Sequence, residues 1–225
     1  MKLATWNVNS IRARLPHVLD WLAAQRPDVL CLQETKVTDA EFPHEPIHAA
    51  GYHVAHVGQK AYNGVATLTR NPATEVTSAP PGLDGEQKRF VTVNLDDIRV
   101  TNVYVPNGER VGSEKYEFKL RWLAGLRAHL SLELARYPML AVLGDFNVAP
   151  ENLDVYDSRL WENQVLFSEA ERAALRSIFD IGLVDVFRRF EQPPASYTWW
   201  DYRQGAFRRN QGLRIDHILC SPAIG

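Results

Sequence analysis

Residues 140–150 read LAVLGDFNVAP, an apolar run that ends on an aspartate, an aromatic residue and an asparagine. The apolar part predicts a strand threaded through a core, and core strands more often pass into turns built from Gly, Pro, Ser or Asp. Because side chains alternate along a strand, we expect Asp145 and Asn147 on one face and Phe146 on the other. The stretch therefore predicts a buried strand that delivers two oxygen-bearing side chains to one place.

Other short apolar runs rich in β-branched residues predict the remaining strands, at residues 3–8, 29–33, 64–69, 90–95, 100–105, 139–143 and 213–220. The runs at 90–95 and 100–105 are separated by turn-compatible carboxylates, which predicts an antiparallel hairpin. Helical periodicity predicts helices over residues 11–22 and 118–130, and a capping-box pattern predicts a third over 168–179. Strands that alternate irregularly with helices indicate an α/β or α+β class with mixed sheets and outer helices.

Composition narrows the class of protein. The chain has 225 residues, 45% of them hydrophobic, which is enough for one large core, so we expect one domain. A formal charge of -2 excludes a globally basic nucleic-acid binder but not a local basic patch. Cys31 and Cys220 lie in apolar runs, as expected of buried thiols in a reducing cytosol. No signal peptide and no apolar run of about 20 residues is present, so we expect a soluble, intracellular protein with no membrane partner.

Polar side chains end four of the predicted strands, at Asn7 and Asn9, at Glu34, at Tyr104 and Asn107, and at Asp145 and Asn147. Any one of them alone is more simply a polar strand end that faces water. Together they favour a hard-cation site, because Mg²⁺ takes carboxylate and amide oxygens and needs only one or two protein carboxylates. A zinc site is not expected, since the histidines and cysteines show no ligand spacing.

Several motifs carry a family resemblance: WNVNSIRAR, LQETK, NVYVPNG, LGDFNVAP, GLVDVFR, YTWWDYR and GLRIDHIL. In this order and spacing, from residue 1 to about residue 222, they resemble the exonuclease III family of abasic-site endonucleases. The resemblance implies a DNase I-like fold, a four-layered sandwich of two mixed β-sheets flanked by helices. It also implies Mg²⁺-dependent cleavage of DNA 5′ to an abasic site, and many members add 3′-to-5′ exonuclease and 3′-phosphodiesterase activity.

The resemblance assigns roles to the residues at the strand ends. It makes Glu34 the principal Mg²⁺ ligand, with Asn7 and Asn9 nearby and Mn²⁺ as an alternative ion, and it places Tyr104 and Asn107 against the scissile phosphate. Asp145 then acts as the base that activates water or as the acid that protonates the leaving oxygen, and Asn147 orients it. The implied partner is double-stranded DNA with abasic sites, bound by a monomer in the cytoplasm at the bacterial nucleoid.

One motif of the family is not found. Family members end with a Ser-Asp-His motif whose histidine is oriented by the aspartate of the RID stretch, here Asp216, and this sequence contains no Ser-Asp-His. His217 is not expected to replace that histidine, because adjacent strand residues point to opposite faces. We therefore expect residues 1–225 to form one catalytic domain that lacks the family's last segment, has an exposed sheet edge and is poorly active.

The segment at 199–214, WWDYRQGAFRRNQGLR, interleaves aromatic residues with arginines and suits DNA recognition. We expect phosphate contacts from the four arginines, Arg203, Arg208, Arg209 and Arg214. A nucleotide without a base has no stacking to lose, and by resemblance Trp200 and Leu213 line the small apolar pocket that accepts it.

Two alternatives stay open from the sequence. The first is another phosphoesterase of the same superfamily, acting on inositol phosphates, sphingolipids or mRNA tails, with Asn7, Glu34, Asp145 and Asn147 in common. The second is a catalytically incomplete module that binds DNA lesions without cutting them. The segment rich in arginine and aromatic residues favours a DNA-repair enzyme over the first alternative. The lack of a Ser-Asp-His motif supports the second alternative.

Overall fold

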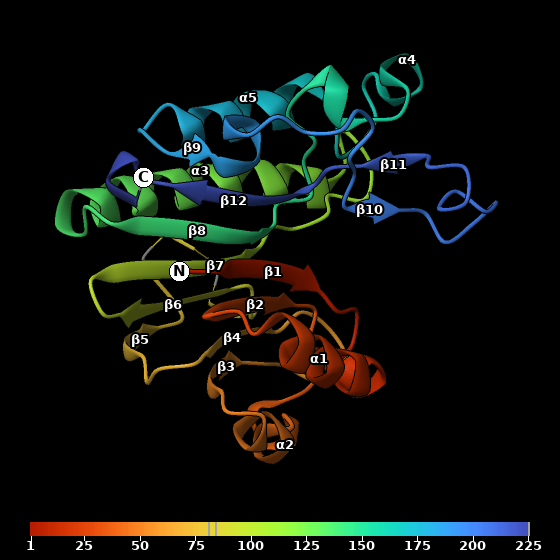
Figure 1. Ribbon diagram of the computed structural model, residues 1–225. Helices are drawn as coiled ribbons and strands as arrows, with labels where there is room; N and C mark the ends of the chain where they lie inside the picture. The colour runs from red at the N-terminus through yellow and green to blue at the C-terminus, as the bar shows by residue number, and fades with distance from the viewer. Residues whose placement is uncertain (81, 84, 225) are drawn as a thin grey trace.

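The computed structural model describes residues 1–80, 82–83 and 85–224, and within these residues two β-sheets stack face to face (Figure 1). The first sheet has the order β1-β2-β4-β3, formed by Leu3–Asn7, Val29–Gln33, Val65–Thr69 and His53–Val57. The second has the order β5-β6-β7-β8-β12-β9, formed by Thr74–Thr77, Phe90–Leu95, Ile98–Tyr104, Leu140–Asp145, Asp216–Cys220 and Val184–Asp185. A separate antiparallel ribbon pairs β10, Trp199–Trp200, with β11, Gly212–Leu213.

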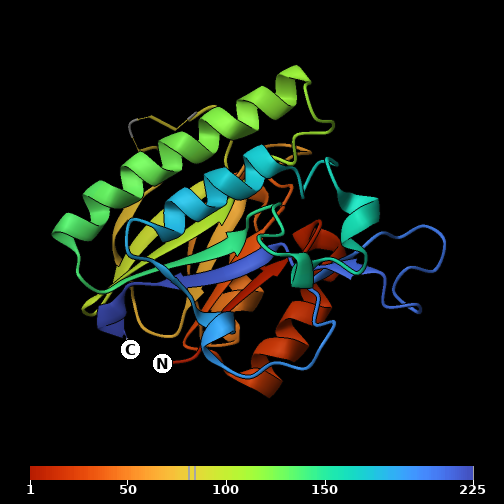
Figure 2. The same ribbon diagram turned by 90° about the horizontal axis from the view of Figure 1, so that it is seen from above.

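Helices cover the outer face of each sheet (Figures 1 and 2). Beside the first sheet lie α1, Ile11–Gln25, and α2, His44–Ala49, while α3, Glu114–Arg136, and α5, Glu169–Phe179, cross the second. A short α4, Ser158–Trp161, and 3₁₀ turns at Asp39–Glu41, Asn152–Asp154, Val186–Arg189 and Pro222–Ile224 complete the described helices. The order of layers is helix, sheet, sheet, helix, which confirms the expected four-layered sandwich.

Strand β8 is buried on both of its faces, which explains the apolar run in its sequence. Leu140 and Val142 pack in the cluster under α3 and α5, and Ala141 and Leu143 pack in the cluster between the two sheets. Each side chain is fully buried, and burying one such aliphatic side chain contributes about 1.5–3 kcal/mol. A strand buried on both faces therefore needs a continuous apolar run, as residues 140–143 have.

The strongly patterned elements appear where they were expected. Strands β6 and β7 pair antiparallel from Phe90↔Val103 to Leu95↔Ile98, which confirms the hairpin. Ser168 caps α5 and accepts a hydrogen bond from the Glu171 amide, which confirms the capping box. Four strands were not expected: β3, β5 and the two-residue strands β9 and β10. Strand β5 is mostly exposed at the sheet edge, so its sequence TEVT carries no apolar signal.

Parallel pairing places the polar strand ends together. β1 pairs parallel with β2 and β7 pairs parallel with β8, so the carboxyl ends of all four strands lie at one end of the sandwich. Gly144 permits the close packing there: its φ is +152° and an added Cβ would lie 1.9 Å from the Val103 carbonyl oxygen. The chain thus lies against β7 one residue before Asp145, where a side chain would not fit.

Within the described residues, none of the helices has the length and apolar character needed to span a membrane. Cys31 and Cys220 are both buried and unpaired in this part of the chain, which confirms the expectation of buried thiols.

Candidate active site

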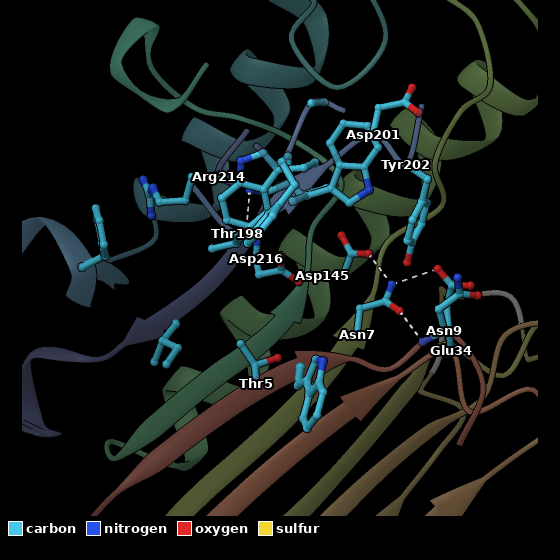
Figure 3. Close-up of a pocket in the computed structure, with 18 of the residues that line it drawn as sticks. Thr5, Asn7, Asn9, Glu34, Asp145, Thr198, Asp201, Tyr202, Arg214 and Asp216 are labelled. Carbon is cyan, nitrogen blue, oxygen red and sulfur yellow. Dashed lines mark hydrogen bonds between the residues drawn. The ribbon is translucent and has the colours of Figure 1, made fainter. Parts of the chain in front are cut away.

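The Asn7 side chain joins two carboxylates at the carboxyl end of the strands (Figure 3). Its Nδ2 donates to Glu34 Oε1 at 2.8 Å and to Asp145 Oδ2 at 2.9 Å. Its Oδ1 accepts from the Asn9 backbone N–H at 3.0 Å, so the amide presents its donors to both acids. One amide from the first sheet thus holds an acid of each sheet in a fixed relation.

Glu34 turns toward Asn7 because the chain bends sharply after β2. Glu34 and Lys36 have φ values of +55° and +57°, a left-handed conformation that non-glycine residues adopt mainly at constrained sites. The Lys36 ammonium pairs with Glu34 Oε2 at 2.8 Å and also donates to Asn9 Oδ1. Burial raises the pKa of Glu34, but hydrogen bonds from Lys36 and Asn7 outweigh it, so the pKa lies below its ordinary value.

Asp145 and Asp216 face each other on neighbouring antiparallel strands, since β12 pairs with β8 in the register Asp216↔Asp145. Burial raises the pKa of Asp145 to about 6, against hydrogen bonds from Asn7 and from the Asn147 amide. Burial and the nearby Asp145 charge also raise the pKa of Asp216 well above its usual range. Among the described residues, Asp216 Oδ1 is buried without a hydrogen-bond partner. The pair can therefore hold a proton near neutral pH.

The side chain of Asn147 is placed by a turn, which corrects the expectation from strand alternation. Phe146 does point away from the site, into the cluster under α3 and α5, and Asp145 points toward Asn7. However, β8 ends at Asp145, and Asn147 adopts φ +51°, a conformation that asparagine tolerates well. Its amide N–H then donates to Asp145 Oδ1 at 2.9 Å, and its Oδ1 accepts from Asn107 Nδ2 at 3.2 Å.

Tyr104 ends β7 beside the same acids. It is buried, and the Arg89 guanidinium lies 4.5 Å from its ring centroid. Burial and the charges of Glu34 and Asp145 raise the pKa of Tyr104, so its hydroxyl stays protonated and is a hydrogen-bond donor to Glu34.

Both Asp145 and Asp216, together with Asn7, Asn9 and Glu34, line a cavity of about 840 Å³ (Figure 3), whereas Tyr104, Asn107 and Asn147 are not among its lining residues. Asn7, Asn9, Glu34, Asp145 and Asp216 form its polar side. The opposite side comes from β10 and from the loop that connects β10 to β11, which projects from the sandwich at the right of Figure 2. It contributes Trp200, Arg208 and two strongly exposed aromatics that the sequence did not single out, Tyr202 and Phe207, at 81% and 71% exposure.

Two residues expected at the DNA surface are in the core instead. Leu213 is fully buried in the cluster with Ala149 and Phe167, because β11 packs its side chain inward. Arg214 is 1% exposed, and its guanidinium is held by Asp154 at 2.6 Å and by Asp185 at 2.8 Å. Two carboxylates already pair with its guanidinium, so Arg214 has a structural role even though it lines the cavity, and the structure does not support its expected phosphate contact.

The other arginines of the segment are exposed. Arg208 lines the main cavity, and Arg209 donates to the Gln204 carbonyl at 2.6 Å beside a smaller cavity. The Arg203 side chain is 87% exposed and pairs with Asp201. These three remain available for phosphate contacts.

His217 points away from the cavity, as the strand alternation predicted. Its ring packs against Phe146, Nδ1 lies 3.0 Å from Arg214 Nη1, and Nε2 lies 2.8 Å from the Val148 carbonyl oxygen. Because an arginine can only donate and a carbonyl can only accept, the ring is neutral with its proton on Nε2. Burial, followed by the Arg214 charge, lowers the pKa of His217 to about 4.

We expect a His217→Gln variant to lose less stability in acid than the wild type. Because the pKa of His217 is lowered from 6.5 to about 4, the neutral ring contributes to the free energy of unfolding above pH 6.5. This contribution is lost as the pH falls from 6.5 to about 4. The loss amounts to about 3 kcal/mol, and glutamine does not titrate. Urea unfolding at pH 7.5 and pH 4.5 measures the difference, and equal losses in both proteins would contradict it.

Comparisons with known proteins agree with this geometry. Residues 4–225 match the model of the endonuclease/exonuclease/phosphatase family. Exodeoxyribonuclease III of Haemophilus influenzae is 37% identical over 239 residues, which cover 100% of this chain and 89% of the relative. The 3′ phosphatase NExo from Neisseria, solved with a product DNA hairpin, matches with a TM-score of 0.97 at 42% identity, over 99% of this chain and 87% of that one. An AP endonuclease from Archaeoglobus fulgidus matches with a TM-score of 0.95 at 40% identity, over 99% of this chain and 87% of that one.

Proposed function

Because this chain belongs to the endonuclease/exonuclease/phosphatase family and is a hydrolytic nuclease of the exonuclease III type, we propose that it cuts DNA 5′ to abasic sites and trims blocked 3′ ends. The AP endonuclease from Archaeoglobus fulgidus supports the first activity and the 3′ phosphatase from Neisseria supports the second. The observation that carries the proposal is the Asn7 bridge between Glu34 and Asp145 at the floor of the cavity. It holds a cation-binding acid and a proton-handling acid side by side.

The residues around Glu34 fit a hard divalent cation. Glu34 Oε2 and Asn9 Oδ1 already converge on one cation, the Lys36 ammonium, and Asn7 Oδ1 faces the same corner. No group of three His, Cys, Asp or Glu side chains forms a metal cage in the described residues, which suits Mg²⁺, an ion that keeps several waters and needs few protein carboxylates. Glu34, with Asn7 and Asn9, would hold the ion, and Mn²⁺ has similar ligand preferences. When bound, the ion supplies charge neutralisation on the phosphate oxygens.

The remaining steps need a proton carrier and donors. Asp145, with its pKa raised to about 6, takes a proton from the attacking water or gives one to the leaving oxygen, and the Asn147 amide fixes its direction. The Tyr104 hydroxyl and the Asn107 amide donate to the phosphate. Asp216 is the second acid of the Asp145–Asp216 pair, and its buried Oδ1 can accept a hydrogen bond.

Replacing Glu34 with glutamine is expected to raise the Mg²⁺ concentration for half-maximal cleavage at least about tenfold, because the variant loses the one strongly ionised ligand of this corner. A Mg²⁺ titration of initial rates measures it. Glu45→Gln, an exposed acid of α2, is the matched control. An unchanged Mg²⁺ requirement would remove Glu34 from the metal site.

The double variant Arg208→Ala, Arg209→Ala is expected to flatten the salt dependence of DNA binding. Each lost phosphate contact lowers the slope of log affinity against log salt by about 1. Fluorescence anisotropy between 50 and 300 mM KCl would measure the slope. The double variant Arg121→Ala, Arg136→Ala on α3 removes the same charge from another surface, and identical slopes in both would exclude a phosphate contact.

A substrate panel tests the proposal as a whole. Fluorescent duplexes would carry an internal abasic analogue, a 3′-phosphate at a nick, or an undamaged recessed 3′ end, and an inositol polyphosphate would serve as competitor. Cleavage of the first two, without inhibition by the inositol polyphosphate, is expected. Tight binding of the abasic duplex without any product would instead support a lesion-binding module.

A further inference from the structure

A buried ion pair lies beneath the polar side of the cavity. It joins Lys119 of α3 to Glu171 of α5, the two helices that run side by side over β8 (Figure 2), and both side chains are 0% exposed. A lysine in such a place is costly, because its ammonium gives up hydration that the protein must replace. Lys119 also lies on the inward stripe of α3, beside Trp122 and Leu123, where an apolar residue would ordinarily pack.

The ammonium has three protons, and all three have acceptors. Besides the Glu171 carboxylate, Nζ donates to the Asn107 carbonyl at 3.1 Å and to the Asn147 carbonyl at 2.6 Å. These carbonyls belong to the two segments that leave β7 and β8 at the site. The packing is tight, since a Cβ added at Gly108 would lie 3.1 Å from Lys119 Cδ.

Both segments carry residues of the proposed reaction. The Asn107 side chain donates a hydrogen bond to the Asn147 side chain, and the Asn147 backbone N–H donates to Asp145 Oδ1 at 2.9 Å. A shift of the Asn147 backbone therefore turns the Asp145 carboxylate. The Lys119 ammonium and the Asp145 carboxylate are thus linked through Asn147.

Glu171 is itself held firmly. Its Oε1 accepts from the Leu166 amide at 3.0 Å, and its Oε2 accepts from the Ser168 amide at 3.1 Å and from the Ser168 hydroxyl. The carboxylate is thus part of the cap of α5. It gives Lys119 a rigid anchor that side-chain motion does not relax.

We propose that Lys119, anchored by Glu171, is a positioning residue whose ammonium fixes the Asn107 and Asn147 segments so that Asp145 and the phosphate donors keep their working geometry. The inference rests on the proposed function. Buried ion pairs contribute little net stability compared with a well-packed apolar pair, so the main effect of this pair is expected in geometry and rate. Misplacement of reacting groups by about 1 Å can cost about 10²-fold in rate.

The test compares two double variants. Lys119→Met, Glu171→Gln removes both charges, which avoids the unpaired buried acid that the single variant would leave. The matched control Arg99→Met, Glu133→Gln removes a second buried pair, at 2.6 Å, from the other ends of β7 and α3. We expect the first double variant to lower kcat about 10- to 100-fold, with KM and DNA affinity within about threefold of the wild type. The control is expected to keep the kcat of the wild type.

A second readout does not depend on activity. Hydrogen exchange of the amides in residues 105–109 and 145–149 is expected to speed up in the Lys119 double variant and not in the control. Unchanged exchange there, or a kcat within twofold of wild type, would overturn the inference, as would an equal loss of kcat in the control. A wild-type protein that cuts none of the panel substrates would defeat the proposed function instead, and the exchange data would still decide the positioning role.

Discussion

An Asp145→Asn variant is expected to cut abasic DNA about 10²- to 10⁴-fold more slowly than the wild type while binding it as tightly. The range is what a positioned acid or base contributes. Asparagine keeps the size of the side chain and an oxygen that accepts from the Asn147 amide, while its NH2 group replaces the oxygen that accepts from Asn7, so of these two contacts only the Asn7 contact is lost. It cannot carry the proton that the raised pKa of about 6 makes available.

Single-turnover kinetics give the rate and fluorescence anisotropy gives the affinity. Asp180→Asn, an exposed acid at the end of α5, is the control for the change in charge. A rate within tenfold of the wild type would mean that another group carries the proton.

Replacing Arg214 with methionine is expected to lower the free energy of unfolding by about 3–5 kcal/mol, the range seen when one partner of a buried ion pair is removed. The variant leaves Asp154 and Asp185 with less compensation, and Arg188 still pairs with Asp154 but not with Asp185. The same change removes the donor that fixes the His217 ring.

Urea unfolding at pH 7.5 measures this loss. Arg203→Met, at an exposed pair with Asp201, is expected to cost less than about 1 kcal/mol. Similar losses in both variants would contradict a structural role for Arg214, and a flatter salt dependence of DNA binding in Arg214→Met would restore its phosphate contact.

The strand ends were predictable because a two-residue period and parallel pairing leave few choices. A short apolar run such as residues 140–143 predicts a core strand, and the polar residue that ends the strand, here Asp145, appears at its carboxyl end. The same reasoning reached Asn7, Glu34 and Tyr104. It did not reach Asn147 correctly, because the position depends on one left-handed residue after the strand.

The errors share a physical cause: partners that lie far away in the sequence. Arg214 looks like its exposed neighbours until Asp154 and Asp185 are brought beside it by the fold. Leu213 looks like a pocket residue until the short β10–β11 ribbon turns it inward. Local sequence contains neither contact.

Lys119 shows a signal that periodicity did contain. The expected helix over residues 118–130 had an apolar stripe, and Lys119 falls on that stripe, one turn before Leu123. A charged residue on an inward stripe requires a buried partner. Its identity, Glu171 on α5, becomes visible only when the two helices pack.

The most direct measurement is incision of a fluorescent duplex with one abasic analogue by the 225-residue chain, in Mg²⁺ and in EDTA, with the product ends mapped. A single cut 5′ to the lesion that needs Mg²⁺ and is slowed at least about 10²-fold by Asp145→Asn is the predicted result. Cutting that persists in EDTA or is unaffected by Asp145→Asn, or lesion binding with no cut, would contradict a metal-assisted phosphodiester site built on Glu34, Asn7 and Asp145.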